Sequence, residues 1–95
     1  VPDGAVMMCT ALVVAKPASA ITDGVGFDIE GLVYRSGSTT ALLSIPNSTA
    51  HGSNTLALAA TFVANDTLEG LEIQVTGAAA TTIYWAGELK CVQVL

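Results

Sequence analysis

The sequence predicts an all-β protein: a single antiparallel β-sandwich of jelly-roll type with about six to eight strands. Three observations favour this class. Apolar and polar residues alternate with a period of two along most of the chain, as in strands with one buried face. Clusters of Gly, Pro, Asn, Asp and Ser divide the chain at intervals of about 8 to 14 residues. No segment carries a convincing apolar stripe at helical spacing.

The first predicted strand, residues 6–15, is apolar on both faces. This pattern is typical of a central strand covered on each side or of a strand at an interface. The next strand alternates from Val25 to Val33, with Asp28 and Glu30 directed outward. Three further alternating rows follow, and their inward residues are Leu56, Leu58, Ala60 and Phe62; Leu71, Ile73 and Val75; and Ile83, Trp85, Gly87, Leu89 and Cys91.

These rows define an expected core with Trp85 as its main anchor. Its predicted members are Phe27, Ile29, Val33, Phe62, Ile73, Val75, Trp85 and Leu89. Turns are predicted at residues 2–4, 16–24, 36–38, 46–48, 51–54, 65–66 and 77–78. We expect residues 46–54 to form an exposed outward tip, because they are polar and free of bulky side chains. The candidate contact residues of this tip are Asn47, Ser48, His51, Ser53 and Asn54.

Composition limits the functions open to the chain. Its 95 residues fit one domain spanning residues 1–95, and its start at Val1 predicts a processed or truncated chain, or the ordered part of a longer one. Only three residues are Lys or Arg and the net charge is −5, so a nucleic-acid-binding role is disfavoured. The longest apolar stretch, residues 11–15, is far shorter than the roughly 20 residues that cross a bilayer. We therefore expect no membrane insertion.

A low charge content indicates a surface that other subunits cover. Hydrophobic residues make up 52% of the chain and charged residues only 12%, against about 25% in a typical soluble domain. Small side chains are predicted on strand faces that point away from the core, at Ala11, Val13, Ala57, Ala59, Thr61 and Ala86. Tyr34 and Tyr84 are also expected to face outward, where Tyr serves well at interfaces. The pattern favours a homo-oligomeric structural component.

The residues that could carry chemistry have simpler explanations. His51 is the only histidine and no G-x-S-x-G turn is present, so we expect an exposed loop histidine. Asp28 and Glu30 project from one strand face and are expected to be solubilising charges. Cys9 and Cys91 are either two reduced thiols in a strand core or a disulfide joining the first and last strands. We predict no catalytic, cofactor-binding or metal site, and hence no enzyme.

The chain resembles β-sandwich domains of bacteriophage virion proteins, of the capsid-decoration and tail-fibre type. The resemblance rests on residues 1–4 with the apolar strand after them, on residues 27–35, and most of all on residues 71–92, where a strand, a Thr-Gly-Ala turn and a Trp-bearing final strand follow one another. It implies a non-enzymatic, trimeric virion protein that contacts itself and other virion proteins, or a host receptor at a fibre tip. The alternatives are a carbohydrate- or receptor-binding module and a pilus or surface-layer subunit built by strand exchange.

Overall fold

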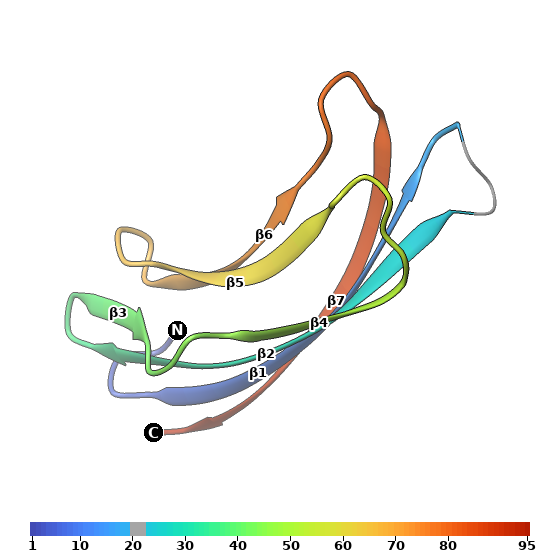
Figure 1. The fold of residues 1–95 in the computed structure, drawn as a ribbon. Helices are drawn as coiled ribbons and strands as arrows, with labels where there is room; N and C mark the ends of the chain where they lie inside the picture. Colours follow the sequence, from blue (N-terminus) through green and yellow to red (C-terminus); the bar gives the residue numbers. More distant parts are fainter. Residues whose placement is uncertain (20–22) are drawn as a thin grey trace.

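A computed structural model describes residues 1–19 and 23–95, and within these ranges the chain forms seven antiparallel strands and no helix. The strands are β1 (Val6–Pro17), β2 (Gly24–Ser36), β3 (Thr39–Leu42), β4 (Asn47–Ser53), β5 (Ala59–Asn65), β6 (Gly70–Thr76) and β7 (Ile83–Val94). β5 and β6 form a small sheet over a five-stranded sheet made of the others (Figure 1). The predicted all-β antiparallel sandwich is confirmed.

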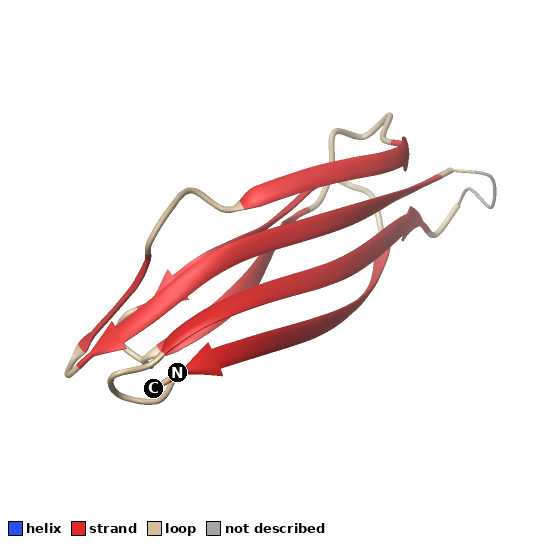
Figure 2. Cartoon of the chain, turned by 90° about the horizontal axis from the view of Figure 1, so that it is seen from below, coloured by secondary structure: helices blue, strands red, loops and turns tan. Residues whose placement is uncertain are grey.

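The large sheet is built around β1, which pairs with β2 on one side and with β7 on the other. These long strands run side by side in Figure 2. β3 and β4 pair one after the other with the remaining edge of β2, so together they act as one edge strand interrupted at residues 43–46. β1, β2 and β3 pair in chain order, and so do β5 and β6. β4 instead pairs with β2 and β7 returns to pair with β1, so the chain crosses to the small sheet after β4 and back after β6.

The core lies between the two sheets and follows the predicted alternation. The buried apolar residues are Cys9, Ala11, Val13 and Ala15 of β1, Val25, Phe27, Ile29 and Val33 of β2, and Leu58, Ala60 and Phe62 at β5. Gly31 lets the sheets approach each other, because a Cβ at this position would lie 2.8 Å from Cδ2 of Phe62. The alternation predicted for residues 25–33 is therefore confirmed, and its one glycine has a packing role.

The predicted core extends too far toward β7. Val75 is 42% exposed and Leu89 is 44% exposed, while Ile73 and Trp85 are only partly buried. The reason is the size of the small sheet: β5 packs against β2, β3 and β4, and two strands do not reach across to cover β7. Trp85 therefore packs at the margin of the core.

Two further predictions about individual segments are wrong. Residues 47–53 of the expected tip form strand β4, because their backbone pairs with β2 from Gly24 to Glu30 despite their low strand propensity. Ala11 and Val13 are buried rather than outward, since β1 turns its odd-numbered residues toward the small sheet. Of the turn predicted at residues 16–24, residues 20–22 lie outside the described residues.

A disulfide and a group of polar contacts cross-link the strands. Cys9 and Cys91 lie opposite each other on β1 and β7 and are joined by a disulfide, one of the two alternatives that the sequence left open. At the β5–β6 turn, Glu69 accepts a hydrogen bond from the buried Thr40 hydroxyl, and Nε of Arg35 lies 3.6 Å from the Glu69 carboxylate. The contacts of Glu69 join the small sheet to β2 and β3.

The molecule exposes more surface than a compact chain of its size. Its accessible area is 5669 Å², against about 5,100 Å² expected for 9.6 kDa. Its radius of gyration is 14.8 Å, against roughly 12.4 Å for a compact 95-residue domain. The principal extents of 45 × 22 × 18 Å describe an elongated slab. The faces of the large sheet that the small sheet leaves uncovered contribute to this excess surface.

Candidate functional site

The face of the large sheet that points away from the small sheet is rich in exposed apolar side chains. On β1 and β7 the even-numbered residues point to this side, because the odd-numbered ones of β1 enter the core. Leu12 is 65% exposed and Val14 is 55% exposed. We define the outer apolar face as Val6, Met8, Leu12 and Val14 of β1 with Tyr84, Ala86, Val92 and Val94 of β7.

Strand register places these residues in two apolar groups with polar residues between them. Val6 lies opposite Val94 and Met8 opposite Val92 at one end, and Val14 lies opposite Ala86 toward the other. Between them, Lys90 and Glu88 of β7 lie opposite Thr10 and Leu12. Directly opposed side chains in an antiparallel pair are only about 5 Å apart, so each pair forms an unbroken apolar contact. An exposed surface of this kind marks an interaction site more often than a solvated face.

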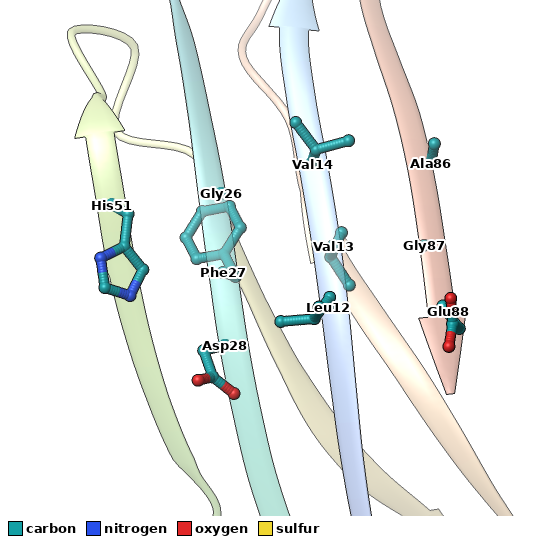
Figure 3. A pocket seen from close by; sticks show the side chains of 10 residues that line it. All are labelled: Leu12, Val13, Val14, Gly26, Phe27, Asp28, His51, Ala86, Gly87 and Glu88. Atoms are coloured by element: carbon teal, nitrogen blue, oxygen red, sulfur yellow. The ribbon is translucent and has the colours of Figure 1, made fainter. Parts of the chain in front are cut away.

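A groove of about 480 Å³ lies in the middle of this face. Its floor is low where Gly26 and Ala86 contribute little or no side chain, and Leu12 and Val14 stand beside it (Figure 3). The outer apolar face is thus contoured rather than flat, so it can receive a protruding side chain from a partner.

Charged groups cross the face in a narrow band. Asp28 on β2 and Glu88 on β7 both lie opposite Leu12, one on each side (Figure 3). Their backbones are separated by two strand spacings, roughly 10 Å. His51 borders the groove from β4. The band supplies polarity at the centre of an apolar surface, as specific interfaces do.

The two tyrosines predicted at an interface lie on the outer side of the large sheet but at its opposite ends. Tyr34 is half-buried and pairs with Val6, whereas Tyr84 is exposed and pairs with Lys16. These two β1 positions are ten residues apart, or about 33 Å along the strand. The tyrosines lie at the two ends of the outer apolar face and cannot both contact one small ligand.

The residues of the predicted tip are dispersed along β4 and the segment after it. Asn47, Ser48, His51 and Ser53 belong to β4 and are exposed, yet the Ser48 hydroxyl donates to the carbonyl of Ala60. The side chain of Asn54 bonds both the N–H and the C=O of Leu58 and so shapes the turn into β5. They form no common loop surface.

One carboxyl pKa is shifted, and its position is structural. The neighbouring Ser53 side chain, together with the Thr55 hydroxyl that donates a hydrogen bond to Oδ2 of Asp23, holds the pKa of the Asp23 carboxyl, just before β2, below the ordinary value. The contact joins β2 to the segment after β4. It lies away from the outer apolar face.

The residues that sequence reasoning missed are Met8, Leu12 and Val14. The signal was present, because residues 6–15 are apolar at both parities and only one parity can face the core of a two-layer sandwich. Sequence alone did not settle which parity enters the core. Ala11 and Val13 were therefore assigned outward in place of Leu12 and Val14.

Within the ranges 1–19 and 23–95, no group of three or more His, Cys, Asp or Glu side chains is placed to hold a metal ion. The described residues also contain no helix long and apolar enough to span a membrane. Comparison of the chain with protein-family models, with curated proteins and with solved structures found no match.

Proposed function

We propose that this chain is a non-enzymatic structural subunit of a bacteriophage virion, a capsid-decoration or fibre component that acts through its outer apolar face. The observation that carries the proposal is that face: seven large apolar side chains of β1 and β7 stand exposed on one side of one sheet. The resemblance to phage β-sandwich domains supplies the biological setting. The expected state is a homotrimer that also contacts other virion proteins.

The outer side of the large sheet has room for a specific interface. Its four strand positions, spaced about 4.8 Å apart and about 40 Å long, cover roughly 750 Å², and the outer apolar face on β1 and β7 is about half of this area. A standard protein–protein interface buries about 800 Å² on each partner. A partner of standard size would therefore cover the outer apolar face together with the neighbouring strands β2 and β4.

A carbohydrate-binding module is the second candidate that the sequence raised, and the geometry gives it less support. Aromatic platforms for sugars need neighbouring rings, and Tyr34 and Tyr84 lie about 33 Å apart along the sheet. The groove beside Leu12 is lined at its surface by aliphatic and charged groups. Binding on a glycan array that is lost in Tyr84→Ala would reverse this preference.

The native mass of the purified chain in non-reducing buffer tests the association. We expect an oligomer for the wild type and a smaller species for Val14→Lys, which places a charge on the outer apolar face. Gln74→Lys adds the same charge to an exposed position of β6 and serves as the control. A monomeric wild type, or a Val14→Lys variant that assembles like Gln74→Lys, would contradict an interface at this face.

The virion setting needs its own measurement. Peptides of this chain should be found by mass spectrometry in density-banded phage particles, at a fixed ratio to the major capsid protein or to the fibre. An assembled chain that never bands with particles would leave the interface intact and remove the virion assignment.

A further inference from the structure

The large sheet ends at β7, whose outer edge pairs with no strand among the described residues. β7 runs for 12 residues from Ile83 to Val94, one of the longest strands of the molecule. An edge strand of this length presents a row of backbone donors and acceptors that can pair with another chain. We call this outer side of β7 the free edge.

The strand register shows which residues supply these backbone groups. The Cα atoms of Cys9 and Cys91 are 4.2 Å apart, close to the roughly 4.5 Å of a non-hydrogen-bonded antiparallel pair and below the roughly 5.5 Å of a bonded one. The N–H and C=O of Cys91 therefore point away from β1. The same holds for Leu89 and Gly87, because bonded and non-bonded positions alternate along the strand.

We infer that the free edge binds the β7 strand of a second copy of this chain, antiparallel, about a two-fold axis at Leu89. In this register Leu89 faces the partner's Leu89, and Gly87 faces the partner's Cys91. All of these odd-numbered residues direct their backbone groups outward, so they form the bonded pairs of the new ladder. The axis lies at the middle of β7, and the contact uses the whole strand.

Charge selects this register and favours a second copy as the occupant. With the axis at Leu89, Glu88 faces the partner's Lys90 and Lys90 faces the partner's Glu88. Moving the axis by one residue sets Glu88 against the partner's Glu88, or Lys90 against the partner's Lys90. Like charges directly opposite each other destabilise a strand pair, and opposite charges stabilise it. β7 is thus complementary to itself about its own midpoint.

The neighbouring pairs agree with the same axis. Ala86 faces the partner's Val92, and Tyr84 faces the partner's Val94, an aromatic and β-branched pairing that is favourable across strands. Within one chain, Nζ of Lys90 already lies 3.1 Å from Oε1 of Glu88, and both side chains are exposed. Two copies would close these four charges into an alternating ring. The contact forms through backbone groups at the sheet edge, whereas the proposed interface covers the outer apolar face from above. The β7 side chains Tyr84, Ala86, Val92 and Val94 border both contacts, and the edge adds a second interface to the proposed one.

Charge reversal tests the inference in the full-length, oxidised chain. Sedimentation equilibrium would follow wild type, Glu88→Lys, Lys90→Glu, the double variant, and an equimolar mixture of the two single variants. Each single variant should weaken this association roughly tenfold or more. The double variant and the mixture should restore it, because both regain opposite charges across the axis. Glu72→Lys changes the net charge equally on β6 and should associate like wild type.

Amide exchange separates this edge from the outer apolar face. In associated wild type the N–H groups of Gly87 and Leu89 should be protected, and Glu88→Lys should expose them. The N–H of Glu88 bonds β1 in every variant and serves as the internal reference. Val14→Lys should leave protection at Leu89 unchanged. A failure of the proposed interface on the outer apolar face can therefore be distinguished from a failure of the β7 pairing. Fast exchange at Leu89 in the wild type, or single variants that associate normally, would overturn the inference.

Discussion

Replacing Gly31 with Ala probes the closest approach between the two sheets. The added Cβ would lie 2.8 Å from Cδ2 and 3.5 Å from Cε2 of Phe62, and 3.6 Å from Cβ of Pro46. Phe62 is fully buried, so its ring has little room to move aside. Overpacking of this kind costs about 2 kcal/mol, which would lower Tm by roughly 8 to 16 °C in a domain of this size.

Thermal and urea unfolding followed by Trp85 fluorescence would measure this cost. Gly77→Ala is the matched control, since a Cβ at Gly77 meets no atom within 4 Å. It should change stability by less than roughly 1 kcal/mol. Phe62→Leu combined with Gly31→Ala should cost less than the sum of the single changes, because the smaller side chain relieves the clash. A Gly31→Ala protein as stable as Gly77→Ala would refute the packing argument.

Three other predictions concern the contacts that fasten the sandwich. Reducing the bond between Cys9 and Cys91, which closes a loop with a sequence separation of 82, should lower the free energy of unfolding by about 4 to 5 kcal/mol; a urea midpoint unchanged by reductant would contradict this. Glu69→Ala leaves the buried Thr40 hydroxyl without its acceptor and should cost about 1 to 3 kcal/mol in urea unfolding, whereas a neutral result would show that water replaces the carboxylate. The lowered pKa of Asp23 stabilises the fold above its unfolded-state pKa, and this contribution is lost as pH falls through the folded-state value. The Tm difference between wild type and Asp23→Asn should therefore shrink from neutral pH to about pH 2.5, and a constant difference would count against the hydrogen bonds as its cause.

Alternation predicted the fold class and much of the core, because the period-two pattern of residues 25–33 matches a strand with one face in the core. The same reasoning failed at Leu89, which has the correct parity but lies beyond the reach of a two-stranded cover. The odd or even position of a residue in its strand determines which side of the sheet it faces, whereas its burial depends on how far the opposite sheet extends. Strand β4 was missed for a related reason: its polar residues pair with β2 through the backbone, which leaves little pattern in the side chains.

The position of the exposed apolar face was only partly predictable. Tyr84 is exposed, as the alternation of residues 83–91 predicted. Choosing between Val13 and Leu12 as the exposed residue required the position of the small sheet, since both odd and even positions of β1 are apolar. Composition indicated an excess of apolar residues, and three-dimensional packing was needed to show which of them are exposed.

The two edges of the large sheet differ in regularity. On the β3–β4 side, residues 43–46 leave the ladder, Ile45 is 94% exposed, and Pro46 lacks a backbone donor. Gly52 adds a φ of 97°, and a Cβ there would lie 2.7 Å from the carbonyl oxygen of Gly24. Such breaks discourage further strands from adding to an edge. Strand addition through β7 would therefore end at a pair of copies, because neither remaining edge of the joined sheet accepts a further strand, and the ladder would not propagate into a fibril.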